Sequence, residues 1–273
     1  MGSTPGTIIV GVDGTPASMR AVHWAAGQAA AEHRQLTLVH AAGAMHAGGR
    51  HLLDDAREQV ARWAPDTEVF SLLEVADAPS LLLTASVDAT MVVVGSHGRG
   101  PVRTALLGSV GIALVRHAAC PVVVVRPSNL GAVRNGVLVG VDGLPESRPV
   151  LEFAYREASL LELPLTVLHA AGSAAGTTIP ALDVAPMTPE DRESEQRAVA
   201  EAMAGMTEKY PDVTVTSRMS DAHPADALVR LGARMNLVVV GAHQRGLLER
   251  LVAGSVSATV VEHARCPVAV VPV

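Results

Sequence analysis

The sequence predicts an α/β protein built from two tandem copies of one module, each a five-stranded parallel sheet with helices on both faces. Short β-branched runs alternate with longer segments of helical periodicity, which is the pattern of a parallel sheet. The module is duplicated, because Val10–Gly14 recurs as Val139–Gly143 at an offset of 129 and Val92–Gly95 recurs as Val238–Gly241 at an offset of 146. At 273 residues, the chain is also long enough for two domains.

The composition argues against a membrane or nucleic-acid partner. Hydrophobic residues make up 49% of the chain and aromatic residues 2%, so we expect cores built from Ala, Val and Leu. Every apolar run is far shorter than the roughly 20 residues of a membrane span, and the N-terminal stretch lacks a signal-peptide pattern. We therefore expect a cytoplasmic protein. A net charge of −6 without a Lys/Arg run argues against a general nucleic-acid surface.

In the first copy, strands are expected at the short apolar runs 7–13, 35–41, 68–73, 91–94 and 121–126. The first helix should follow Thr15, an N-cap candidate, and Pro16, a residue favoured at the first helical position. A second helix is expected over Leu53–Trp63, where apolar residues recur at helical spacing. Two further helices are expected over 79–87 and from Gly108 onward.

A short linker, 127–135, separates the copies, and we expect domains at 1–128 and 134–273. The strands expected in the second copy are 136–142, 164–170, 213–218, 236–241 and 267–272. Its expected helices are 145–161, one long helix carrying Val199, Met203, Met206 and Tyr210, 224–234 and 255–263. The two repeat offsets differ by 17 residues (146 − 129), most of them in 171–188, which is rich in Ala, Gly, Thr and Pro. This stretch is expected to be a surface loop or a lid over a nucleotide.

The stretch Met91–Gly111 is the most informative about function. A buried strand ends at Gly95, a glycine-containing loop with Gly98 and Gly100 follows, and an amphipathic helix begins at Gly108-Ser109. Backbone N–H groups in such a loop, together with the positive end of the helix, form an anion site suited to phosphate. In the alternative interpretation, the glycines serve only to turn the chain.

The spacing Gly95-x2-Gly98-x9-Gly108-Ser109 resembles the nucleotide-binding signature of ATP-binding members of the universal stress protein family, and the resemblance covers both halves of the chain. It implies a doubly wound, Rossmann-like sheet of the adenine nucleotide alpha hydrolase type, with strand order 3-2-1-4-5. It also implies ATP as the ligand, with Mg²⁺ arriving with the nucleotide. Ligands of such sheets bind beyond the carboxyl ends of the strands where the order reverses, here between the strands that end in Asp13 and Gly95.

Two nucleotide sites follow from the resemblance, each bringing together the ends of strands one, two and four. The first would consist of Gly11, Val12, Asp13, Ala41, Val94, Gly95, Gly98, Arg99, Gly108, Ser109 and Val110. The second would consist of Gly140, Val141, Asp142, Ala170, Val240, Gly241, Gly254, Ser255 and Val256. Each Asp could instead be a turn or N-cap residue, and Arg99 and the aligned Arg245 could face either phosphate or solvent.

The second loop departs from the signature at Gln244, which stands where the first has Gly98. If that position requires positive φ, a side chain costs about 1–2 kcal/mol, and its Cβ would crowd the phosphates. We therefore expect the second site to bind ATP more weakly than the first, or to discriminate differently.

No motif for fast catalysis or for a protein-bound metal is present. The chain lacks the GxxxxGK[ST] P-loop, and Ser109 is not in a GxSxG context. The aligned histidine pairs are split between the copies, so neither copy gathers a metal-ligand cluster. Cys120 and Cys266 precede buried strands and are expected to be core thiols. We expect a binding protein with at most slow ATPase activity.

The leading hypothesis is an adenine-nucleotide-binding stress-response regulator that acts through an unidentified protein partner. A slow nucleotide hydrolase or transferase, or a scaffold with vestigial pockets, are the alternatives. The apolar strands Val122–Val125 and Val268–Val271 would be liabilities if left unpaired. The resemblance implies that they pair, giving an internal pseudo-dimer, with homodimerisation in addition.

Overall fold

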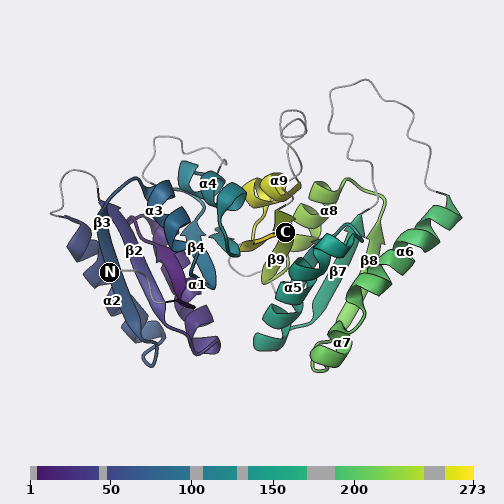
Figure 1. Cartoon of the computed structure of the whole chain (residues 1–273), viewed down its shortest axis with the longest axis horizontal. Helices are drawn as coiled ribbons and strands as arrows, with labels where there is room; N and C mark the ends of the chain where they lie inside the picture. Colours follow the sequence, from purple (N-terminus) through teal and green to yellow (C-terminus); the bar gives the residue numbers. More distant parts are fainter. Residues whose placement is uncertain (1–4, 43–47, 99–106, 128–134, 171–187, 243–255) are drawn as a thin grey trace, which may run out of the picture. The chain divides into compact units, whose positions relative to one another are not determined.

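The computed structural model describes residues 5–42, 48–98, 107–127, 135–170, 188–242 and 256–273. The chain divides into two compact units, 1–128 with 267–270 and 129–266 with 271–273. In each unit, strands lie side by side in a sheet with helices packed on it (Figure 1). The α/β class predicted from the alternating patterns is confirmed.

The first repeat has the predicted order of elements. Its strands are β1 (Ile8–Gly11), β2 (Leu36–Ala42), β3 (Val69–Val75), β4 (Met91–Gly95) and β5 (Val122–Val125). Its helices are α1 (Pro16–Ala31), α2 (Gly49–Trp63), α3 (Ala78–Ala85) and α4 (Ser109–His117). The strand order is β3-β2-β1-β4-β5, with neighbours parallel, which confirms the expected order 3-2-1-4-5. The order reverses between β1 and β4.

The second repeat follows the same plan. Its strands are β6 (Val137–Val141), β7 (Leu165–Ala170), β8 (Val215–Ser220), β9 (Leu237–Ala242) and β10 (Val268–Pro272), in the order β8-β7-β6-β9-β10. Its helical elements are η2 (Pro145–Ser147), α5 (Arg148–Leu160), α6 (Pro189–Met203), α7 (Met206–Lys209), α8 (Pro224–Gly232) and α9 (Val256–His263).

Packing of the helices places the core on both faces of each sheet. In the first repeat, α1 contacts α2 and α3 contacts α4, and right-handed crossovers put these two pairs on opposite faces. The central strands are therefore buried on both sides, as the fully buried pairs Ile8-Ile9, Val92-Val93 and Val123-Val124 show. Within the first unit, β5 is also covered at its outer edge, since Val268–Val270 pair antiparallel with it.

Two helices differ from the sequence-based predictions. The helix expected over 145–161 begins as the short 3-10 turn η2, and α5 starts at Arg148. Pro149 explains the change, because proline fits a first helical turn but would break a helix that began at Pro145. The long helix expected to carry Val199 to Tyr210 is interrupted at Gly205, whose φ of +79° ends α6 before α7 begins.

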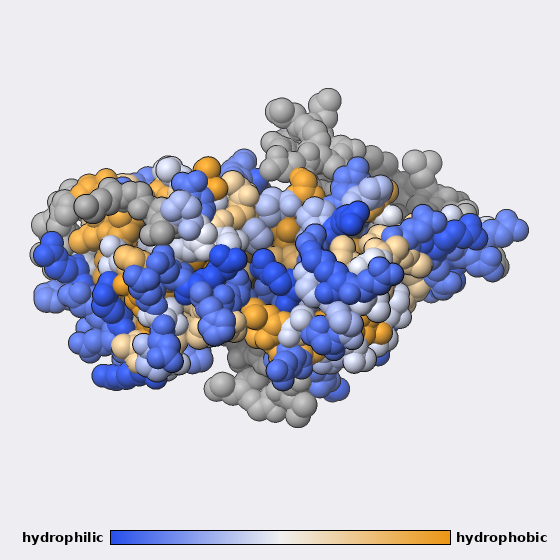
Figure 2. All heavy atoms as spheres, turned by 60° about the horizontal axis from the view of Figure 1, so that its bottom comes forward, coloured by the Kyte–Doolittle hydropathy of each residue, from blue (hydrophilic) through white to orange (hydrophobic). Residues whose placement is uncertain are grey.

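The surface is mainly hydrophilic on the face drawn in Figure 2, with hydrophobic side chains in smaller patches. Among the described residues, no helix has the length and apolar character needed to cross a membrane. Both cysteines, Cys120 and Cys266, are buried and not joined in a disulfide, as expected for core residues.

Candidate functional site

Asp13 lies in a hydrogen-bonded turn between β1 and α1. Its Oδ1 accepts hydrogen bonds from Thr15 N at 2.9 Å and Thr15 Oγ1 at 2.7 Å. Gly14 has a φ of +79°, which a residue with a Cβ would rarely adopt. Thr15 Oγ1 in turn accepts from Ser18 N at 3.2 Å, so the predicted N-cap is confirmed. These hydrogen bonds support the interpretation of Asp13 as a turn residue, but they involve only one of its two carboxylate oxygens.

The second oxygen of Asp13 faces Gly98, which lies in the loop that follows β4 (Met91–Gly95). A Cβ built on Gly98 would lie 3.1 Å from Asp13 Oδ2, closer than most real Cβ contacts. Within the described residues, this oxygen has no hydrogen-bond partner. Gly98 itself is exposed. The structure therefore brings together two of the residues that the sequence predicted for one crevice.

The loop after β4 returns to the same place at the start of α4. Gly108 N donates to Ser96 O at 3.3 Å, and a Cβ on Gly108 would lie 3.7 Å from Gly98 N. Arg99, also a predicted site residue, lies outside the described residues. Gly98 and Gly108 therefore form the base of the loop, directly beside the carboxylate of Asp13.

The N-terminus of α4 opens onto this base. Gly108 is its N-cap and has no side chain to satisfy the first N–H groups of the helix. Ser109 is exposed and Val110 is half-buried, so the first turn is accessible. Free N–H groups and the positive end of the helix dipole make this position suitable for an anion such as phosphate.

Gly95 has a packing role that the sequence analysis did not anticipate. A Cβ on Gly95 would lie 2.6 Å from the backbone carbon of Ala17 and 2.9 Å from Ser18 N. No side chain fits there, because the atoms in the way belong to the backbone of α1. Gly95 therefore allows the end of β4 to approach the first turn of α1, which carries the Asp13 turn. Its neighbour Val94 is buried.

His40 is a positioning residue that the sequence analysis missed. Its Nδ1 lies 2.6 Å from the carbonyl oxygen of Val12, so the ring ties β2 to the residue before Asp13. In the second repeat, His169 Nδ1 lies 3.0 Å from the carbonyl oxygen of Val141. The two histidines recur at the repeat offset of 129, which is the signal in the sequence for a shared structural role. Their neighbours Ala41 and Ala170, predicted for the adenine side, are both half-buried.

In the second repeat, the structure describes the predicted site residues at the ends of the strands and at the start of α9, but not those of the loop between them. Asp142 Oδ1 accepts from Leu144 N at 3.1 Å and from Ser147 Oγ at 2.5 Å. Gly140 packs against Leu228, as Gly11 packs against Leu82. Val240 is buried, Gly241 is half-buried, and Val256 begins α9. The loop predictions for Gly254, Ser255, Arg245 and Gln244 lie outside the described residues.

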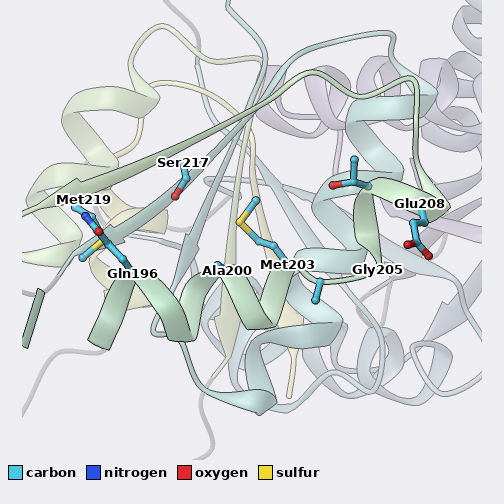
Figure 3. Close-up of a pocket in the computed structure, with 9 residues that line it drawn as sticks. Gln196, Ala200, Met203, Gly205, Glu208, Ser217 and Met219 are labelled. Carbon is cyan, nitrogen blue, oxygen red and sulfur yellow. The ribbon is translucent and has the colours of Figure 1, made fainter. Parts of the chain in front are cut away.

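Two other features bear on the chemistry available to the protein. No group of three or more His, Cys, Asp or Glu side chains within the described ranges could hold a metal ion. A cavity of about 730 Å³ lies between α6, α7 and β8, with Gln196, Ala200 and Met203 of α6 on one side of it (Figure 3). None of the predicted site residues lines this cavity.

Comparison with known proteins identifies the family. A model of the universal stress protein family matches residues 5–126 and again 134–272. The chain belongs to the universal stress protein family. Universal stress protein Rv2623 of Mycobacterium tuberculosis is 37% identical to it over 286 residues, which cover 96% of this chain and 95% of that protein. This universal stress protein is therefore a tandem-domain member of the family.

The fold is also found among solved structures. The crystal structure of a universal stress protein from Archaeoglobus fulgidus covers 97% of this chain and 96% of its own, with 17% identity and a TM-score of 0.64. A universal stress protein solved in complex with cAMP covers 45% of this chain and 98% of its own, with 29% identity and a TM-score of 0.40. The full-length likeness confirms the tandem universal stress protein fold.

Proposed function

We propose that this universal stress protein binds an adenine nucleotide, with ATP as the preferred ligand, at the end of β1 and β4 in each of two domains, 1–128 and 134–273. The proposal rests above all on the meeting of Asp13, Gly98 and Gly108 beside the N-terminus of α4. This meeting lies where the strand order reverses, which is the general ligand position in doubly wound sheets. The family membership and the glycine signature support the same ligand class.

The phosphates would bind at the base of the glycine loop. The exposed backbone at Gly98 and the first N–H groups of α4 offer donors without side chains in the way. Ser109 would add a hydroxyl donor. Mg²⁺ would be carried by the phosphates rather than by a protein cage, since the described residues gather no ligand cluster.

The carboxylate of Asp13 would recognise the sugar rather than the phosphates. Its Oδ2 is an acceptor without a partner in the described residues, whereas a phosphate would repel it. A ribose hydroxyl can donate to it. His40 would hold the backbone of Val12 in place on the adenine side, next to Ala41.

The proposed role is regulation through binding, not fast catalysis. Phosphoryl transfer requires a base that orients the nucleophile and cations that stabilise the transferred group. The described residues around Asp13 and Gly98 offer a phosphate cradle, and the carboxylate beside it, Asp13, is assigned to the ribose and not to a catalytic base. The nucleotide-bound state would act on an unidentified regulatory partner, with this protein as a cytoplasmic homodimer.

The test is to identify small molecules released from freshly purified protein by mass spectrometry, and then to follow added ATP for several hours. A co-purified adenine nucleotide that is not consumed would support the proposal. Steady release of ADP would favour a slow hydrolase, and a protein that neither carries nor takes up nucleotide would favour a scaffold.

A further inference from the structure

The strand β8 has one side that no other described strand pairs with. It stands at the end of the strand order, beside β7, as β3 stands at the other end beside β2. Leu165 N of β7 donates to Thr214 O, so the even-numbered residues of β8 pair with β7. The backbone N–H and C=O groups of Val215, Ser217 and Met219 therefore point outward, where a further strand could bind them.

In the first repeat, an arginine of the covering helix caps the matching edge. Arg57 of α2 donates from Nη2 to Val69 O of β3 at 2.7 Å, and the same nitrogen lies 3.5 Å from Ser71 Oγ. At the repeat offset of 146, Val69 and Ser71 correspond to Val215 and Ser217 of β8. The guanidinium thus occupies the outward side of β3, which is one way in which proteins protect an edge strand.

The second repeat has Met203 at the position of Arg57, again at the offset of 146. A thioether cannot donate to the edge of β8 as a guanidinium does. Instead, a cavity of about 730 Å³ separates Met203 of α6 from Ser217 and Met219 of β8 (Figure 3). Within the described part of the chain, the outward backbone groups of these two β8 residues have no hydrogen-bond partner. The cavity is therefore lined by the residues that an added strand would pair with.

Two tyrosines keep α7, which also lines this cavity, away from α5. Tyr155 of α5 and Tyr210, the C-cap of α7, stack with their ring centroids 5.9 Å apart. The corresponding residues of the first repeat are Ala26 and Ala64, which are both buried. Because interiors are close-packed, two aromatic rings prevent the approach that two methyl groups allow. The cavity thus follows from substitutions that are specific to the second repeat.

The lining of the cavity determines which segment would fit. Side chains of an added strand alternate between its two faces, so residues i and i+2 would both face α6. Met203 and Met219 provide an adaptable apolar surface. Among the described residues that line the cavity, Glu208 is the only charged one, and it is exposed. A segment with an apolar residue and a Lys or Arg two positions apart would match both features.

A second copy of this chain would match them less well. If β8 paired with β8 of another copy, the side chains directed at each cavity would be those of Val215, Ser217 and Met219, which include no cation for Glu208. Such a twofold pairing would also bring two Glu208 carboxylates to the same side of the joined sheet. Charge complementarity therefore favours a basic segment of another protein.

We propose that the outer edge of β8 binds an extended segment of a partner protein in which an apolar residue and a Lys or Arg, two positions apart, face α6. The segment adds a strand to the sheet through the outward backbone groups of β8. Its apolar side chain lies between Met203 and Met219, and its cation pairs with Glu208. The edge of β3 does not bind the segment, because Arg57 caps it. The inference does not depend on nucleotide binding.

Fluorescence anisotropy of a rhodamine-labelled peptide, titrated with the full chain, tests the proposal. The probe is Thr-Leu-Thr-Lys-Thr, and the control peptide has Glu in place of Lys. We expect saturable binding of the probe that weakens with added salt, and at least about fivefold weaker binding of the control. Absence of saturable binding of the probe at about 1 mM protein would overturn the proposal. Equal affinities for the two peptides would also overturn it.

Variants of the strand edge locate the bound peptide. Ser217→Pro removes an outward N–H, which an edge strand tolerates, and its ring obstructs an added strand. The affinity for the probe should therefore fall by at least about tenfold. Ser71→Pro makes the matched change in β3 and should bind the probe as the wild type does. Met203→Arg introduces the capping residue of the first repeat and should also abolish binding. Wild-type affinity in Ser217→Pro would refute the proposal.

Glu208→Lys separates recognition from folding. This variant should prefer the Glu peptide to the Lys peptide, a reversal that a loss of stability cannot produce. Thermal unfolding reports whether each variant is folded, and Met203→Arg and Glu208→Lys decide the matter if Ser217→Pro is not. Sedimentation without peptide measures self-association. A dimer that excludes the probe and dissociates in Ser217→Pro would show that β8 pairs with a second copy, which would overturn the proposal.

Discussion

Asp13 and Gly98 meet at the ends of β1 and β4, where a Cβ on Gly98 would lie 3.1 Å from Asp13 Oδ2. Neither residue alone indicates a site, because Asp-Gly pairs and glycine loops both occur in ordinary turns. Because they lie close together, a carboxylate that can accept a hydrogen bond stands beside a backbone segment without a side chain. The N-terminus of α4 is next to both. The predictions for nucleotide binding depend on this relationship.

Replacing Gly98 by Val should abolish most ATP binding in the first domain and leave the fold intact. The new side chain would fill the space beside Asp13 Oδ2, and we expect a loss of affinity of at least about tenfold. Gly98 is exposed, so the thermal midpoint should change little. Titration calorimetry measures the affinity. Gly27→Ala is the control, since a Cβ there meets nothing within 4 Å. Unchanged affinity in Gly98→Val would count against the loop assignment.

The two sites should bind ATP unequally. Gln244 occupies the position of Gly98, and because Gly98 does not have a positive φ, the backbone strain considered from the sequence does not apply and only crowding of the phosphates remains. One kcal/mol of crowding corresponds to about a fivefold loss in affinity. Calorimetry on the wild-type protein should resolve a tighter and a weaker site, and Gln244→Gly should bring the weaker one closer to the tighter. Two equal sites in the wild-type protein would disprove the asymmetry.

Gly95→Ala should lower the stability of the first domain and not only its affinity for the ligand. The added methyl group would lie 2.6 Å from the backbone of Ala17, so β4 and α1 would have to separate. Overpacking of this kind costs about 1–3 kcal/mol. Denaturant unfolding of the variant should show a reduced free energy, whereas Gly27→Ala should not. A variant as stable as the wild type would mean that the approach of β4 to α1 is not tight in solution.

Thr15→Ala should lower both stability and nucleotide affinity. The Thr15 hydroxyl caps α1 and donates to Asp13 Oδ1, so the substitution removes a cap worth about 1 kcal/mol and leaves the carboxylate held only by the backbone N–H of residue 15. Asp77→Ala is the matched control, because Asp77 caps α3 through Ser80 and has no contact with the site. Both variants should melt earlier, but only Thr15→Ala should bind ATP less tightly in calorimetry.

Cys120 should resist thiol reagents in the folded protein. Burial raises the pKa of its thiol from 9.0 to about 12, so the reactive thiolate is scarce at neutral pH. The unfolded chain releases this proton at lower pH than the folded one, and stability should therefore decline as pH rises above about 9. The rate of Cys120 alkylation in a Cys266→Ser variant, compared with and without denaturant, measures how far folding protects this thiol. Rapid labelling of the native protein would contradict it.

Much of the fold could be predicted from local patterns. Alternating β-branched runs and helical periods located the strands of both repeats, and Thr15-Pro16 marked the start of α1. The failures had local causes that outweighed periodicity. The helical spacing of Val199 to Tyr210 continues across Gly205, but the left-handed conformation of that glycine breaks the helix. In α5, Pro149 favours a helix that starts at Arg148 and not at the expected Pro145.

The candidate site could be predicted only in part. The glycine spacing located the loop after β4, but it did not reveal that Gly95 serves packing against Ala17, or that His40 holds the carbonyl of Val12. Both facts involve residues distant in sequence that become neighbours only when strands pair in a particular order. Periodicity carries no information on such pairs.

The amino-acid sequence by itself determined the duplication, the alternation of strands and helices and the position of the glycine loop, because these depend on residues close together in the chain. Only the tertiary structure decided that Asp13 faces Gly98, and that Arg57 reaches the outer edge of β3 whereas a cavity separates Met203 from that of β8. The physical reason is that strand order and register set which side chains meet. A hydrogen bond between distant residues exists only after the sheet has formed.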